Sequence, residues 1–107
     1  MASYYKNAKV DLTSTGVTTL YTAPAATTAV FKSLLVADDS GSTSTITVTL
    51  TDSASAVFVV FNVKVTSANA TVELLTQPLV VQESEILKVT AANANRLHVI
   101  GSYVEIS

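Results

Sequence analysis

The chain has no cysteine and no tryptophan, and its 107 residues include one histidine, three glycines and two prolines. Without cysteine it can form neither a disulfide framework nor a thiolate metal site. The single histidine, His98, leaves a catalytic triad or a two-histidine metal site incomplete. We therefore interpret His98 as a partly exposed residue in a strand.

Charged side chains are also scarce. Six Lys and Arg against eight Asp and Glu give a net charge of −2. No basic stripe is present, so nucleic acid is not an expected partner. Every apolar run is too short for a membrane span, and the first residues lack the apolar core of a secretory signal. We expect no membrane segment and no signal.

The chain is rich in β-branched residues instead: 16 Val, 16 Thr and 4 Ile make up about a third of it. Such side chains fit a pleated strand better than a helix. Strands are expected at residues 9–13, 17–22, 28–37, 45–51, 56–65, 71–75, 79–82, 85–91 and 97–106. About eight or nine strands with polar turns between them predict a single all-β domain over residues 9–107, an antiparallel and jelly-roll-like β-sandwich.

Strict alternation predicts which side chains face the core. In residues 45–51, threonines alternate with Ile46, Val48 and Leu50, as in a strand with one buried face. In residues 28–37, alternation puts Val30, Lys32, Leu34 and Val36 on one face, and Phe31, Ser33, Leu35 and Ala37 on the other. Gly101, in the middle of the last strand, indicates a bulge or a close backbone approach.

The strand at residues 56–65 is apolar on both faces. Alternation places Phe58 and Val60 on one face and five apolar residues, Val57, Val59, Phe61, Val63 and Val65, on the other. A sandwich buries only one face of each strand, so the second face needs a cover. The cover is a neighbouring subunit, or else a loop or the N-terminal segment. We take the outer face with Phe58 and Val60 as a candidate subunit contact.

Residues 1–8 are polar and aromatic and precede the first expected strand. They are either a frayed terminus or an arm that docks on a neighbouring subunit. In the second case Tyr4 and Tyr5 would be the anchors, since tyrosine combines an apolar ring with a polar tip. Tyr4, Tyr5 and Lys6 are the candidate contacts of this arm.

Other candidate sites are weak. Asp38 and Asp39 lack the further carboxylates of a calcium site, and nothing near Glu83 and Glu85 would raise the pKa of one of them for acid–base catalysis. Nucleotide-binding and hydrolase motifs are missing. We expect no enzymatic activity, no metal and no cofactor. The aromatics that could stack a sugar are scattered and are expected to fill the core: Tyr21, Phe31, Phe58 and Tyr103.

Several stretches resemble small virion structural proteins of tailed bacteriophages. They are Thr-Thr-Leu-Tyr-Thr-Ala-Pro (residues 18–24), Val-Phe-Lys-Ser-Leu-Leu-Val (30–36), the Ser-Gly-Ser-Thr-Ser-Thr-Ile-Thr-Val-Thr-Leu run (40–50), Glu-Leu-Leu-Thr-Gln-Pro-Leu-Val-Val (73–81), Ile-Leu-Lys-Val-Thr-Ala (86–91) and Val-Ile-Gly-Ser-Tyr-Val-Glu-Ile (99–106). The resemblance covers residues 17–106, most of the chain.

This resemblance implies a β-sandwich that serves as a capsid decoration or cement protein, or as an accessory neck or tail protein. It implies no catalytic residue. The implied partners are the major capsid protein, or neck and tail proteins, and further copies of the chain, with a trimer as one arrangement. The implied location is the virion, after synthesis in the cytoplasm of a bacterial host. A small carbohydrate-binding module is the alternative of another class.

Overall fold

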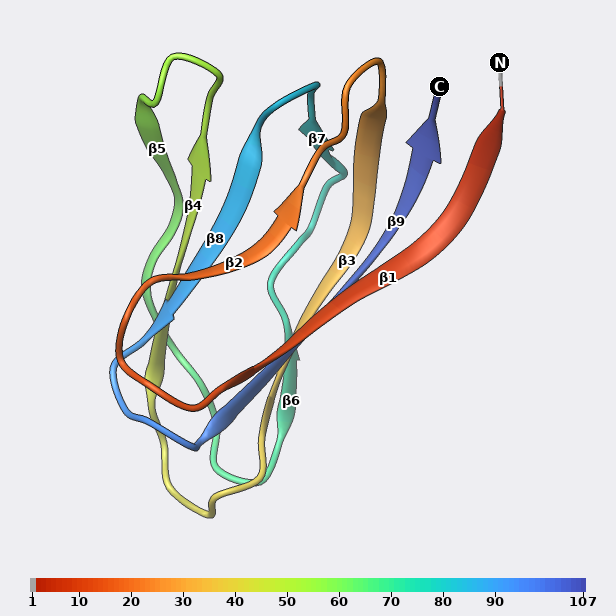
Figure 1. Ribbon diagram of the computed structural model, residues 1–107. Coiled ribbons are helices and arrows are strands. Elements are labelled where there is room, and N and C mark those ends of the chain that lie inside the picture. The colour runs from red at the N-terminus through yellow and green to blue at the C-terminus, as the bar shows by residue number, and fades with distance from the viewer. Residues whose placement is uncertain (1) are drawn as a thin grey trace.

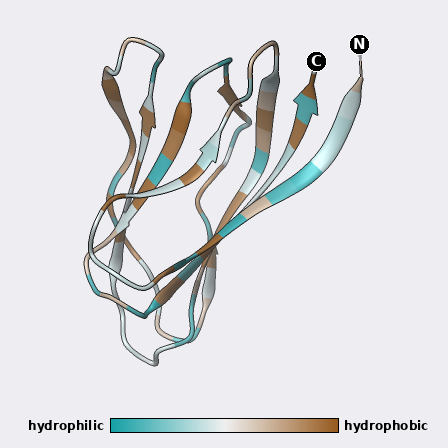
Figure 2. Ribbon diagram, viewed as in Figure 1, coloured by the Kyte–Doolittle hydropathy of each residue, from teal (hydrophilic) through white to brown (hydrophobic). Residues whose placement is uncertain are grey.

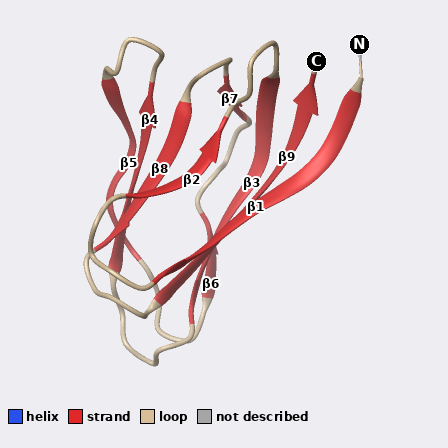
Figure 3. Cartoon of the chain, in the orientation of Figure 1, coloured by secondary structure: helices blue, strands red, loops and turns tan. Residues whose placement is uncertain are grey.

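The computed structural model describes residues 2–107, so Met1, the first residue of the expected arm, lies outside it. The described residues form strands joined by loops and turns, with no helix among them (Figure 3). The strands are β1 (Ser3–Leu12), β2 (Thr18–Thr22), β3 (Thr28–Asp38), β4 (Thr45–Thr51), β5 (Val57–Val65), β6 (Thr71–Glu73), β7 (Leu79–Val81), β8 (Ile86–Ala91) and β9 (Leu97–Ile106).

The strands form two antiparallel sheets (Figure 1). One has the order β1-β9-β3, with both β6 and β7 on the far side of β3, and the other has the order β2-β8-β4-β5. If β6 and β7 count as one interrupted strand, the first strand pairs with the last, the second with the next to last, and so on inward. This is the connectivity of a jelly roll. The predicted antiparallel β-sandwich is confirmed.

The core lies between the inner faces of the two sheets and includes a cluster of three aromatic rings. Phe31 on β3 stacks on Tyr103 on β9 with ring centroids 4.7 Å apart, and Tyr21 on β2 packs against both. All three rings are buried. Ile46 and Val48 on β4 are fully buried as the alternation predicted, and Leu50 packs against the core. The prediction that the scattered aromatics fill the core is confirmed for Tyr21, Phe31 and Tyr103 and is wrong for Phe58, which is 56% exposed.

A bulge in β3 changes which side chains face the core. Phe31 pairs with Tyr103 and Ser33 with Ser102, so Lys32 is an extra residue in β3. A bulge of this kind switches the alternation of side chains along the strand. Phe31 and Leu34 therefore both point inward, and the predicted assignment of these two residues to opposite faces is wrong.

The outer edge of β3 pairs with two short strands instead of one. β6 pairs with residues 35–37 of β3, and β7 pairs with residues 29–31. In the interval between them the Glu73 carboxylate accepts hydrogen bonds from Leu34 N at 2.7 Å and Ser33 Oγ at 2.5 Å. Burial raises the pKa of Glu73, but the bonds from Ser33, Leu34, Leu75 and Leu74 outweigh it and leave the pKa below its ordinary value.

The segment expected as an arm belongs to the sheet. β1 begins at Ser3 and pairs with β9 along its whole length, from Ser3 opposite Ile106 to Leu12 opposite Leu97. The strand is longer than the expected residues 9–13, because residues 3–8 continue it along the long β9. Residues 3–8 are therefore not a separate extension, and removing them would take away more than half of an edge strand.

Replacing Gly101 with alanine should destabilise the fold. A Cβ at Gly101 would lie 2.6 Å from Phe31 Cε2, which confirms the close approach expected at this glycine. Overpacking of this kind costs about 1–3 kcal/mol. The control is Gly16→Ala, whose Cβ would find its nearest neighbour, Ser14 Oγ, at 3.6 Å. Urea unfolding should show a clear loss for Gly101→Ala alone. Equal stability of the two variants would contradict this packing.

Candidate interaction surfaces

β5 carries the largest group of exposed apolar side chains in the described part of the chain. Five of them are between 56% and 70% exposed: Val57, Phe58, Val59, Val63 and Val65. β5 is the edge strand of its sheet, at the far left in Figure 1, and Figure 2 colours much of it as hydrophobic. An apolar edge strand is a template for pairing with another chain. This strand is the main candidate interaction surface.

Two bulges set the faces of β5. Phe61 pairs with Val48 and Val59 with Thr49, so Val60 is an extra residue. Phe61 and Lys64 are three positions apart in β5, but their partners Val48 and Ile46 are only two positions apart in β4. A second extra residue therefore lies between Phe61 and Lys64. The alternation therefore switches twice, which sequence alternation alone could not indicate.

The bulges correct the predicted faces of Phe58 and Val60. Phe58 pairs with Leu50, a residue packed against the core, so Phe58 lies on the inner side of the sheet although it is more than half exposed. Val60 is half-buried and also packs against the core. The two residues are thus not an outer face. The outer side of β5 carries Val57, Val59 and Val65, which pair with Thr51, Thr49 and Thr45.

The second bulge holds a strained residue. Val63 has a φ of 49°, in the left-handed region that a β-branched residue rarely adopts. Its N–H donates to the Thr47 hydroxyl at 3.2 Å, so a side chain of β4 takes the place of a ladder carbonyl. Strained backbone of this kind persists where the surroundings fix it and gathers at functional sites.

The second surface is the edge formed by β1, where Tyr4 is 55% and Tyr5 is 84% exposed. Lys6 Nζ lies 6.0 Å from the centre of the Tyr4 ring. Tyr4 and Lys6 therefore share one face of β1, and Tyr5, between them in the strand, points to the opposite face. β1 and β5 end different sheets, and β1 lies beside β2, at the edge of the second sheet opposite β5 (Figure 1). The five candidate contact residues thus form two surfaces. Their role as contacts stays a prediction.

Lys6 also ties β1 to a polar group at the margin of the core. Its Nζ lies 2.8 Å from Glu105 Oε1, and the Tyr21 hydroxyl donates to Glu105 Oε2 at 2.5 Å. The bond from Lys6, followed by the one from Tyr21, lowers the pKa of the nearly buried Glu105. Burial, and then the bond to Glu105, raises the pKa of Tyr21. No sequence pattern indicated this group, because its members are far apart in the chain.

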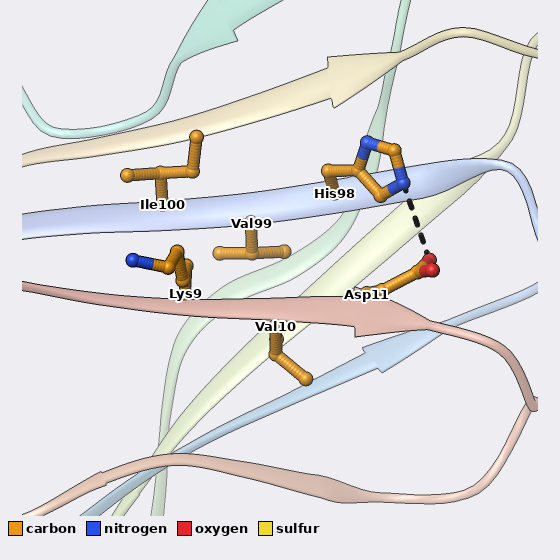
Figure 4. Close-up of a pocket in the computed structure, with 6 residues that line it drawn as sticks. All are labelled: Lys9, Val10, Asp11, His98, Val99 and Ile100. Atoms are coloured by element: carbon orange, nitrogen blue, oxygen red, sulfur yellow. Dashed lines mark ion pairs between the residues drawn. The ribbon is translucent and has the colours of Figure 1, made fainter.

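His98 lies on β9 beside a shallow pocket of about 330 Å³ (Figure 4). Its side chain is 44% exposed, which confirms the expected partly exposed strand residue. His98 Nε2 is 3.3 Å from Asp11 Oδ1, and His98 Nδ1 is 3.9 Å from Asp39 Oδ2. Across residues 2–107, no cluster of three or more His, Asp or Glu side chains is placed to hold a metal ion.

The acidic pairs of the sequence form turns. Asp38 Oδ1 accepts hydrogen bonds from Ser40 N at 2.9 Å and from Ser40 Oγ at 2.8 Å. The backbone bond from Ser40 is the main cause that lowers the pKa of Asp38. Glu83 accepts from Ala26 N at 2.9 Å, and Glu85 accepts from Gln82 N at 2.8 Å. Each of these three carboxylates fixes a loop.

Comparison with known proteins gave no match to a family model, to a curated protein or to a solved structure. Within residues 2–107, no helix has the length and apolar character needed to cross a membrane.

Replacing Tyr21 with phenylalanine should cost about 1–2 kcal/mol of unfolding free energy at neutral pH, because the buried Glu105 carboxylate would lose a donor. Because the pKa of Glu105 is lower in the folded chain than in the unfolded chain, its carboxylate stabilises the fold at pH values above the unfolded pKa. This stabilisation is lost as the pH falls through the folded pKa. The cost should thus shrink below about pH 4. Tyr5→Phe, at an exposed ring, is the control. Urea titrations from pH 7 to pH 3 that show a constant cost would contradict this role.

Proposed function

We propose that this chain is a structural protein of a bacteriophage virion, a capsid decoration or cement protein that stabilises the head lattice. The observation that supports the proposal best is β5, whose five exposed apolar side chains would be buried only by a partner. An assembly protein has such a surface because it functions in contact with other subunits. The resemblance of residues 17–106 gives the specific kind of assembly.

The mechanism is mass action. A protein that binds the assembled lattice, and not its separated subunits, shifts the equilibrium toward the lattice. In this proposal β5 contacts a neighbouring subunit, and Tyr4 and Tyr5 on β1 contact the major capsid protein. Lys6, held by Glu105, sets the geometry of this edge. Such a protein needs no catalytic group, no metal and no cofactor.

The same surfaces would serve an adaptor of the neck or tail, which is the second form of the proposal. A carbohydrate-binding module has less support, although jelly rolls also occur among lectins. Sugar binding by stacking needs exposed aromatic rings in a row. Tyr21, Phe31 and Tyr103 are packed against one another inside the sandwich and cannot stack on a ligand.

The copy number of the chain in purified virions tests the proposal. Quantitative mass spectrometry should find the chain in numbers comparable to the major shell protein, because a decoration protein follows the symmetry of the lattice. A count of about a dozen or fewer would place the chain in a ring at the neck or tail. Absence from the particles would contradict both forms of the proposal.

A further inference from the structure

We infer that β5 pairs with the β5 strand of a second copy of this chain, antiparallel and around a two-fold axis that passes between the Phe61 residues of the two copies. The two four-stranded sheets would then form one continuous sheet of eight strands. The inference deepens the proposed function, and rests on it only for the claim that copies of the chain associate.

The outer side of β5 offers an open set of backbone groups. β4 pairs with one side of β5, and no strand within residues 2–107 pairs with the other. The strand is nine residues long and has a single charge, Lys64. Natural edge strands are protected against pairing by charges, by proline, by bulges or by a covering element. β5 has no proline and no covering strand, and its one charge is Lys64. Its two bulges would hinder pairing with a regular strand, so a partner must match them.

One bulge of β5 lies on each side of Phe61. Val60, the first extra residue, lies on one side of Phe61, and the second extra residue, at Asn62 or Val63, lies on the other. A two-fold axis through Phe61 sets Val60 of each copy opposite Asn62 of the other. Each strand then has the same number of extra residues on each side of the axis. The pairing between the two copies can run from end to end without a further shift.

The faces of the strand agree with this register. Directly opposite residues of an antiparallel pair lie on the same face of the sheet. The axis brings together Val57 and Val65, which both lie on the outer face according to their partners on β4. It also brings together Phe58 and Lys64, which both lie on the inner face. A shift of one residue would place outer side chains against inner ones.

Charge favours the same register. Lys64 would lie opposite the exposed ring of Phe58, where an ammonium group and an aromatic face attract each other. A register centred at Lys64 would instead place the two cations opposite each other, which is destabilising. The pairing at Phe61 thus accommodates the one charge of the strand.

A second copy fits β5 better than an unrelated strand. Bulges bend a strand and increase its twist, so a regular strand would lose register at each of them. A second copy has the same two irregularities in the reverse order. One strand pair buries less than the roughly 1,600 Å² of a standard stable interface. The dimer should therefore depend on protein concentration, and the lattice would add the remaining contacts.

A change of mass with concentration is the first test. Sedimentation equilibrium of the full chain should show monomer and dimer, and Val59→Asp should give monomer only, because it places a carboxylate opposite Val63 in an apolar pair. Val17→Asp is the matched control: Val17 is 66% exposed and lies outside β5, and Val59 is 59% exposed. Wild type that is monomeric at every concentration would overturn the inference, as would a Val59→Asp variant that keeps the dimer.

Cysteine pairing is the second test and does not depend on a destabilising change. The chain has no cysteine of its own, so an introduced thiol has a defined partner. A mixture of Val57→Cys and Val65→Cys chains should form a disulfide-linked dimer on mild oxidation, because opposite residues lie about 5 Å apart, within disulfide reach. Each variant alone should stay unlinked, since its two thiols would lie about 20 Å apart.

The outcomes separate the possible occupants of β5. A dimer without the mixed disulfide would overturn the register. A monomer whose β5 amides are protected only on virions would show that β5 binds a different chain, which overturns the second copy but leaves the virion proposal in place. Conversely, a linked dimer of a chain that is missing from virions would support the β5 pairing and contradict the proposed function.

Discussion

The sandwich depends on the close approach of β3 and β9 at Gly101, where the Phe31 ring lies against backbone that has no side chain. This contact lets Phe31 stack on Tyr103 and lets Tyr21 from the second sheet close the cluster. The bulge at Lys32 supports the same contact, because the extra residue lets both Phe31 and Leu34 point toward the core. β3 and β9, which carry two of the three rings, are buried along much of their length.

β5, by contrast, has no buried residue. It lies at the end of its sheet, farthest from β2 and its Tyr21, and five of its nine side chains are exposed apolar groups. Its two bulges and the left-handed Val63 make it irregular where β4 is regular. An irregular, apolar strand with one unpaired edge is costly for an isolated molecule and useful for an assembly. The contrast between the two ends of the sandwich is the reason to look for function at β5.

Much of the fold could be predicted from the sequence, because β-branched composition and period-two alternation are local signals. The strand boundaries of β4 and β9 were predicted without error, and most others to within one or two residues. The bulges in β3 and β5 could not be predicted, since an extra residue shows only against the partner strand. For that reason the face predicted for Phe58 and Val60 was wrong. The Tyr21–Glu105–Lys6 group was missed because three distant segments meet there.

The candidate surfaces were found in the sequence as apolar or aromatic segments, but their arrangement required the structure. Residues 3–8 read as an arm because they precede the first strong alternation, whereas β9 is long enough to pair with all of them. The two-sided apolar character of β5 predicted a strand that needs a cover from a subunit, a loop or the N-terminal segment, and β1 pairs with β9 in the other sheet while β5 stays exposed. Composition identified the exposed strand, and register determined which of its faces is outward.

Amide hydrogen exchange of β5, measured at low and at high protein concentration, tests the central claim most directly. Pairing between copies predicts that the amides of residues 57–65 exchange more slowly as concentration rises, while those at the exposed edge of β1 are unchanged. Exchange in β5 that is fast and independent of concentration would contradict the claim that this strand is where copies of the chain meet.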